Sequence, residues 1–196
     1  MLRMSAKREM SVCTVAELVS QLGRMTYGES FANGLTPAQW TALRYFSRAN
    51  RFSRTVSAFA EFHATTRGTA SQTIKSLAQR GYLKRKRSKT DGRSVHFILS
   101  NKSKKILSDD PFEALVGATG KLSKSEYRTV AQSLERILSN LAQQGGKCLF
   151  GMCTNCMYFQ KGDRRQKSKS VYICALMDEP LEEAEIEQLC VSFKPI

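Results

Sequence analysis

Cysteines are the residues of this sequence best suited to chemistry, and five of the six lie within the last 49 residues. Cys153 and Cys156 are separated by two residues, a spacing that lets a close pair bind one side of a metal. Cys174 and Cys190 follow after 17 and 15 intervening residues and can complete the site. Four thiolates without histidine suit either zinc or an iron–sulfur cluster. We therefore predict a metal centre held by Cys153, Cys156, Cys174 and Cys190. For Cys148 three roles stay open: a substitute ligand, a free redox switch or no role.

Acid–base and nucleophilic chemistry have little support in this sequence. It contains two histidines, His63 and His96, and we expect both to be ordinary packed side chains. We recognise no Ser/His/Asp set, no glycine-rich phosphate loop and no carboxylate pair placed for catalysis. We therefore predict that the protein is not an enzyme.

Positive charge is abundant and unevenly placed. The chain has 31 Lys and Arg against 17 Asp and Glu, a formal net charge of +14. Between His63 and Lys105 there are 12 basic residues and one acidic residue, Asp91, whereas residues 148–196 have 6 basic and 7 acidic residues. A positive field confined to one region attracts polyanions. We therefore predict that the region 63–105 binds nucleic acid.

The N-terminal residues Met1–Met10 are basic and lack the apolar run of a signal peptide. No segment of the sequence is long and apolar enough to cross a bilayer. We therefore expect a cytoplasmic protein with no membrane partner. Thiols stay reduced in that compartment, which favours metal ligation over disulfide formation.

Three helices are predicted before and within the basic region. The sequence Thr36-Pro37-Ala38-Gln39 is a capping box with proline at the first helical position, and Thr55 caps the next helix. The third helix has a stripe to pack inward and small, polar or cationic residues on its other face. The inward stripe consists of Ala70, Ile74 and Leu77, and the outward face includes Arg67, Ser71, Gln72 and Lys75.

A β-hairpin is predicted directly after this third helix. Gly81 ends the helix, and two strands, 82–87 and 94–99, flank a tip containing Asp91-Gly92. Both strands and the tip carry basic residues. The hairpin therefore has the character of a wing beside a DNA-reading helix.

In this region the sequence resembles the MarR family of winged-helix transcription regulators. The matching segments are Thr69-Ala70-Ser71, Leu77 with Arg80-Gly81-Tyr82-Leu83, and Asp91-Gly92-Arg93-Ser94. Gly92 departs from the Arg found in many members, which leaves Arg93 as the wing residue. The resemblance implies a homodimer that reads a pseudo-palindromic operator in double-stranded DNA, with a small-molecule effector pocket of unknown residues. The implied DNA contacts are Thr66, Arg67, Thr69, Ser71, Gln72, Lys75, Lys84, Arg85, Lys86, Arg87, Lys89 and Arg93.

Two further helices are predicted to form the dimer. Residues 12–25 have an apolar stripe, and a long helix after Ser123 repeats apolar residues in a heptad-like seam until Gly145-Gly146. Capping boxes are expected at Asp110 and at Ser123. The arginines of the region 44–54 are expected either to touch phosphates or to be solvated.

The fold class predicted is therefore mainly α with a small β-wing: a winged helix-turn-helix dimer with long dimerisation helices and a small cysteine-rich appendage. The domain boundaries are 1–146 for the winged-helix and dimerisation domain, with a DNA-reading core at 35–100, and 147–196 for the metal-binding module. Residues 178–187 of the module are acidic and are expected on a solvated helix.

The cysteine module also resembles small four-cysteine domains built like high-potential iron–sulfur proteins. The resemblance rests on Cys-x2-Cys-Met-Tyr-Phe, Tyr-Ile-Cys-Ala-Leu and Leu-Cys-Val-Ser-Phe-Lys-Pro. It implies a [4Fe-4S] cluster, which we favour over Zn²⁺, although the aromatic residues nearby would pack a zinc module equally well.

Together these patterns predict a transcriptional repressor whose cysteine module senses metal, redox state or oxygen. Loss of the cluster is expected to alter how the module packs against the long helix seam. One alternative is a regulator with purely structural zinc and a small-molecule effector. The other is an iron–sulfur electron-transfer protein with a basic docking surface.

Overall fold

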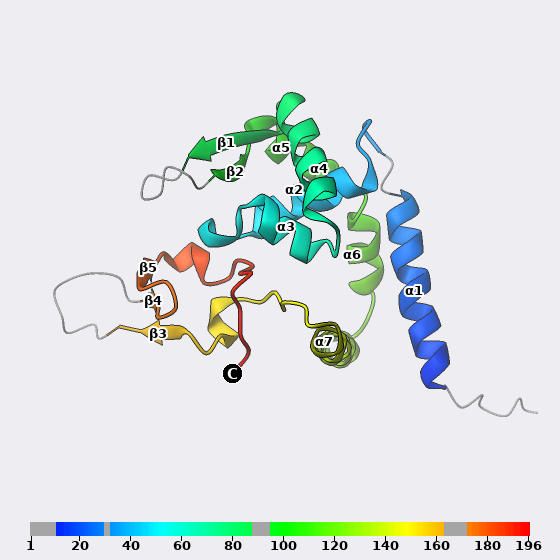
Figure 1. Ribbon diagram of the computed structural model, residues 1–196. Coiled ribbons are helices and arrows are strands. Elements are labelled where there is room, and N and C mark those ends of the chain that lie inside the picture. The colour runs from blue at the N-terminus through cyan, green and yellow to red at the C-terminus, as the bar shows by residue number, and fades with distance from the viewer. Residues whose placement is uncertain (1–10, 30–31, 88–94, 163–171) are drawn as a thin grey trace, which may run out of the picture.

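The computed structural model describes residues 11–29, 32–87, 95–162 and 172–196. Within them the chain is mainly helical and has two small antiparallel sheets (Figure 1). None of the described helices is long and apolar enough to span a membrane. The helices are α1 (Val12–Glu29), α2 (Pro37–Arg48), α3 (Val56–Phe62), α4 (Arg67–Gln79), α5 (Asn101–Ile106), α6 (Glu113–Thr119) and α7 (Lys124–Gly145), and the strands are β1 (Leu83–Arg87), β2 (Val95–Leu99), β3 (Phe159–Lys161), β4 (Tyr172–Cys174) and β5 (Glu179–Leu181).

The best-packed part of the molecule, which we call the winged-helix core, consists of α2, α3, α4 and the β1–β2 hairpin (Figure 1). The capping box at the start of α2 is confirmed: Thr36 Oγ1 accepts from the Gln39 amide at 3.3 Å, and Gln39 Oε1 accepts from the Thr36 amide at 3.0 Å. Thr55 caps α3 as predicted. The core consists of Leu35, Trp40, Ala42, Leu43, Tyr45, Phe46, Ala49, Ala58, Phe59, Ala60, Ala70, Ile74, Leu77, Tyr82, Leu83 and Phe97.

The predicted end of α4 and the hairpin after it are also confirmed. Gly81 has φ of +76°, a left-handed conformation that glycine adopts without strain, and it turns the chain from α4 into β1. β1 pairs antiparallel with β2 from Leu83 opposite Leu99 to Arg87 opposite Val95. The tip of the hairpin, residues 88–94, lies outside the described residues.

Helices α1 and α7 lie away from the winged-helix core (Figure 1). Both are amphipathic as predicted, and the capping box of α7 is present at Ser123 and Glu126. The capping box expected at Asp110 is wrong. Asp110 instead receives two hydrogen bonds of 2.7 Å from the Arg44 guanidinium, and α6 begins without a side-chain cap.

Residues 147–196, which we call the cysteine module, form the sheet β3–β4–β5 and pack under the turn between α2 and α3 (Figure 1). Gly151 lies against the Phe193 ring, where a Cβ would come within 2.6 Å of Cζ. The acidic helix expected at 178–187 is wrong. Glu179 begins β5, and Glu185 lies in a single 3₁₀ turn with its side chain buried.

We predicted from the sequence that the module packs along the apolar seam of α7. In the structure it lies elsewhere. Of the predicted seam residues, Tyr127, Val130, Leu134 and Leu141 are exposed and Ile137 is half-buried. The module is instead attached to the α2–α3 turn by two backbone hydrogen bonds: Leu189 N donates to Arg48 O, and Asn50 N donates to Leu189 O. The seam is therefore available to another partner.

Candidate DNA-reading surface and cysteine pocket

Helix α4 presents the residues predicted to read DNA on one exposed face. Thr66 caps the helix, since its Oγ1 accepts from the Thr69 amide at 3.2 Å, and Ala70, Ile74 and Leu77 anchor the opposite face in the core. Because the buried stripe fixes the rotation of the helix, the outward residues are held in one direction. The exposed residues are Thr66, Arg67, Thr69, Ser71, Gln72 and Lys75.

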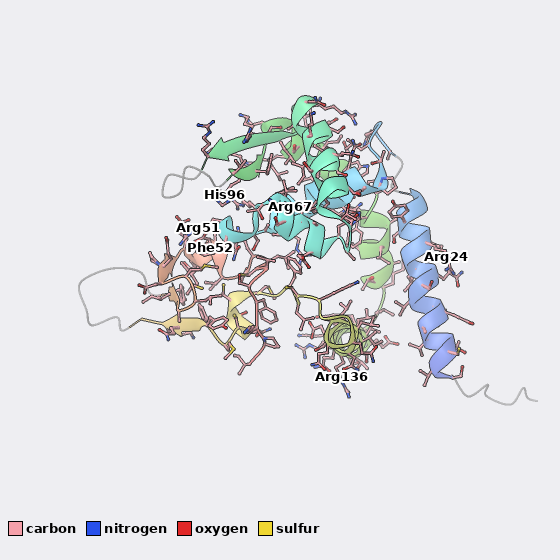
Figure 2. The ribbon with its side chains drawn as sticks, in the orientation of Figure 1. Arg24, Arg51, Phe52, Arg67, His96 and Arg136 are labelled. Atoms are coloured by element: carbon pink, nitrogen blue, oxygen red, sulfur yellow. The ribbon has the colours of Figure 1, made fainter. Side chains whose placement is uncertain are left out.

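A groove of about 700 Å³ runs between α4, the start of α3 and the hairpin. Arg67, Ser71 and Lys75 of α4 line one side, and Arg85 of β1 lines another. Figure 2 places Arg67 near the beginning of α4, on the side facing the viewer. None of the described residues that line the groove carries a carboxylate, and three of them are Lys or Arg.

The first strand of the wing carries four consecutive exposed cations, Lys84, Arg85, Lys86 and Arg87. Side chains alternate between faces along a strand, and the register pairs Arg85 with buried Phe97. Arg85 therefore points to the α4 side of the hairpin, whereas Lys84 and Lys86 point to its other face. The predicted contacts Lys89 and Arg93 lie outside the described residues.

Two of the arginines that were candidates for phosphate contacts form ion pairs with other parts of the chain. Arg44 pairs with Asp110, and Arg51 donates from Nη1 to Glu185 Oε2 at 2.6 Å and from Nη2 to Glu179 Oε2 at 3.1 Å. Arg51 Nη2 also donates to the Pro180 carbonyl at 2.6 Å. Arg51 therefore attaches the cysteine module to the winged-helix core.

The four cysteines predicted to bind metal line one small cavity of about 20 Å³. Cys153, Cys156 and Cys190 are buried, and Cys174 is half-buried. The cavity is also lined by apolar and aromatic residues and by Asn50 and Phe52, which come from the α2–α3 turn. Figure 2 shows Arg51 and Phe52 beside the C-terminal strands. The remaining lining residues are Tyr158, Phe159, Leu176, Leu181 and Ser192.

The thiols are close enough to influence one another. The pKa of Cys153 is raised to about 11 by burial and further by Cys190, Cys156 and Cys174. As they stand, no three or more His, Cys, Asp or Glu side chains in the described ranges form a group that could hold a metal ion. Cys148, the proposed substitute ligand, is exposed and does not line the cavity.

Sequence reasoning missed Asn50 and Phe52 as part of this site. Asn50 is 1% exposed; its Oδ1 accepts from the amide and the hydroxyl of Ser53 at 3.0 and 2.8 Å. Its Nδ2 has no hydrogen-bond partner among the described residues. Nothing in the sequence around Asn50 indicates that it lies beside cysteines more than 100 residues away.

The arrangement of α3, α4 and a cationic hairpin is that of a winged helix-turn-helix. Residues 33–94 match the model of the MarR family. The match to the MarR family contains α2, α3, α4 and β1, and it ends before the first cysteine of the module. Among curated proteins, none matches this chain.

Solved structures share the MarR-type fold. A MarR transcriptional regulator from Methanosarcina mazei Go1 is 20% identical with a TM-score of 0.54, covering 66% of this chain and 96% of that one. The S. aureus MepR–DNA complex is 17% identical with a TM-score of 0.55, covering 69% and 99%. BldR from Sulfolobus solfataricus is 16% identical with a TM-score of 0.52, covering 69% and 99%. About a third of this chain has no counterpart in each of them.

Proposed function

We propose that this protein is a dimeric, sequence-specific DNA-binding transcription regulator of the MarR type, acting as a repressor. The observation that carries the proposal is the exposed polar and cationic face of α4 beside a groove lined by Arg67, Lys75 and Arg85. Arg bonds guanine and Gln bonds adenine when such a helix lies in a major groove. MepR, which has a similar fold, is bound to DNA in its structure.

The two helices outside the core support a homodimer. The α1 side chains Leu18, Leu22 and Met25 are 48%, 49% and 56% exposed, and Leu138 and Leu141 of α7 are 61% and 59% exposed. Rows of apolar side chains on long helices are costly to leave in water, so a second copy is the simplest partner. A symmetric pair would present two α4 helices to two half-sites.

The cysteine module gives the regulator a way to respond to metal, oxygen or redox state. It contacts the α2–α3 turn, which leads directly into the helix-turn-helix, through Leu189, Arg51 and Glu185. A change in the module therefore acts on the segment that positions α3. DNA affinity is sensitive to small shifts of a reading helix.

DNA binding is tested by fluorescence anisotropy with duplexes from the protein's own upstream region at several salt concentrations. Wild type should prefer one duplex, with an affinity that falls steeply with salt. Arg67→Ala should weaken binding to that duplex by about 1–3 kcal/mol, roughly 5–150-fold, because it removes a groove contact. Lys121→Ala removes another exposed cation, between α6 and α7, and is the matched control.

A monomer by light scattering, or no preference among the duplexes at low salt, contradicts the proposal. Equal losses for Arg67→Ala and Lys121→Ala would mean that binding depends on net charge alone and that α4 does not read the sequence.

A further inference from the structure

The four cysteines line one small cavity. Zinc binds four cysteines at about 2.3 Å, which requires the sulfurs to stand about 3.8 Å from one another. The described residues contain no group of three or more His, Cys, Asp or Glu side chains that could hold a single metal ion, but all four cysteines line the same cavity. In a [4Fe-4S] cluster each cysteine binds a different iron, so the sulfurs stand farther apart. Four cysteines that line one cavity therefore supply the one ligand per iron that such a cluster requires.

Asn50 supplies a second, independent observation. Its side chain is almost completely buried, its oxygen is already bonded to Ser53, and its Nδ2 has no partner in the described chain. Buried amide donors normally have an acceptor. Asn50 also lines the four-cysteine cavity, whose occupant would bring sulfur atoms able to accept a hydrogen bond.

The rest of the lining fits the same occupant. Phe52, Tyr158, Phe159, Leu176 and Leu181 surround the thiols with apolar and aromatic side chains. Such a sheath excludes water from a cluster, and its hydrogen-bond donors set the reduction potential. Phe159 and Tyr172 stack with ring centroids 5.5 Å apart, which ties β3 to β4 at the edge of the site.

We infer that Cys153, Cys156, Cys174 and Cys190 bind a [4Fe-4S] cluster and that Asn50 Nδ2 donates a hydrogen bond to one of its sulfur atoms, so that the α2–α3 turn senses the cluster directly. A preassembled cluster is transferred from a carrier: each cysteine thiol releases its proton to solvent, four Sγ–Fe bonds form and the carrier's ligands leave. No electron is transferred in this step.

A short chain of hydrogen bonds connects the proposed cluster site to the start of α3. Cys190 stands between Leu189 and Val191; Leu189 exchanges backbone hydrogen bonds with the turn, and the Val191 amide donates to Ser53 Oγ at 2.9 Å. Ser53 is in turn held by Asn50, and two residues later Thr55 caps α3. Loss of the cluster removes the anchor of Cys190 and the acceptor of Asn50 together. This coupling rests on the proposed DNA-binding function, whereas the cluster does not.

The cluster is tested on the full chain purified without oxygen, by its iron, sulfide and zinc content and its visible charge-transfer absorption. Wild type should contain iron and sulfide in equal amounts. Cys153→Ser and Cys190→Ser should lose them, while the exposed Cys148→Ser and Cys13→Ser should not. Far-UV circular dichroism identifies any variant that fails to fold, and for such a variant Cys174→Ser replaces it. Stoichiometric zinc without iron, or iron retained in Cys153→Ser and Cys190→Ser, would overturn the cluster.

Asn50→Asp keeps the acceptor oxygen for Ser53 but removes the N–H donor. It should hold the cluster about 10–100-fold more weakly and at a lower reduction potential, as expected for loss of an outer hydrogen bond. Asn101→Asp, which adds the same charge at an exposed site on α5, is the control. Equal potentials and equal cluster retention in the two variants would refute the role of Asn50.

The anisotropy assay above, repeated with the wild type before and after chelation of its iron, separates the coupling from the function. We expect the two forms to differ in affinity for the preferred duplex. Equal, specific binding by both forms would overturn the coupling and leave the DNA-binding function standing. Failure of both forms to bind would overturn the proposed function and, with it, the coupling, while the metal analysis would still stand.

Discussion

The winged-helix core and the cysteine module differ in how many apolar side chains they bury. The core cluster consists of 16 buried apolar residues, several of them large and aromatic. In the described part of the module, the buried apolar residues are Leu181 and Leu189 with three of the cysteines. Apolar burial of the first kind stabilises a fold by itself, whereas a small segment with so little of it needs another source of stability.

If the proposed metal site exists, one part of the chain is a stable scaffold and the fold of the other depends on the bound metal. The core has its ring contacts and helix caps irrespective of any ligand. The interior of the module is largely the proposed metal site, so its order should follow occupancy. In the proposed regulator, the module would respond to its ligand while the α4 surface stays folded.

The comparison is tested most strongly by truncating one aromatic ring in each part. Phe59 is 0% exposed and contacts the rings of Tyr45 and Phe46, so Phe59→Ala should lower the free energy of unfolding by about 3–5 kcal/mol. Phe159 is half-buried, and Phe159→Ala should cost about 1–2 kcal/mol. Denaturant unfolding followed by fluorescence reports on the core, because the only tryptophan, Trp40, lies there, and hydrogen exchange measures the loss within the module.

The fluorescence transition should move for Phe59→Ala and stay near the wild-type midpoint for Phe159→Ala. If both variants shift it equally, the core and the module unfold as one unit and the distinction between them is wrong.

The next effect in size concerns the join between the two parts. Arg51→Met keeps the length of the side chain but removes its bonds to Glu185, Glu179 and the Pro180 carbonyl. Glu185 is buried and would lose its cation, so we expect a loss of about 2–3 kcal/mol, less than for a fully buried pair because Arg51 is a third exposed. Hydrogen exchange should show reduced protection in the module and unchanged protection in α4.

Arg48→Met, at an exposed position on α2, is the control and should change stability by less than about 0.5 kcal/mol. Unchanged exchange in the module of Arg51→Met would mean that the backbone bonds of Leu189 and Val191 are sufficient to hold it in place.

The sequence predicted the parts of the fold that depend on local patterns. The start of α2 follows from Thr36 and Gln39, which lie within one helical turn, and the rotation of α4 follows from the spacing of Ala70, Ile74 and Leu77. The hairpin follows from Gly81 and alternating residues on either side of a turn. These features are determined by neighbours along the chain, so their residues alone define them.

The features that were not predicted depend on residues far apart in sequence. Arg51 bonds Glu185 across 134 positions, and Arg44 bonds Asp110, 66 positions away, whose side chain also accepts from the Phe112 amide. Spacing gave four candidate metal ligands, but only the fold places Asn50 beside them. The run of acidic residues at 178–187 predicted a solvated helix. The prediction failed because the sequence gives no sign that Arg51 contacts Glu185 in the fold.

The smallest effect that we expect is a loss of core stability at acidic pH, caused by protonation of His63. His63 is half-buried and stacks on Phe59 with ring centroids 5.4 Å apart, and its burial lowers the pKa of the imidazole. Protonation is therefore harder in the folded protein than in the unfolded chain, whose histidine has a pKa of about 6.5. The contribution of neutral His63 is fully present above that pH and is lost progressively as the pH falls below it.

His63→Gln removes the titration while keeping a polar side chain of similar reach. We expect the wild type to lose more stability than this variant between about pH 7.5 and 5, because only the wild type has this imidazole to protonate. Thermal unfolding of both proteins followed by Trp40 fluorescence reports on the core, where His63 lies. Parallel pH profiles would mean that the imidazole accepts its proton in the folded core as readily as in water, and that the stacked ring on Phe59 is effectively solvated.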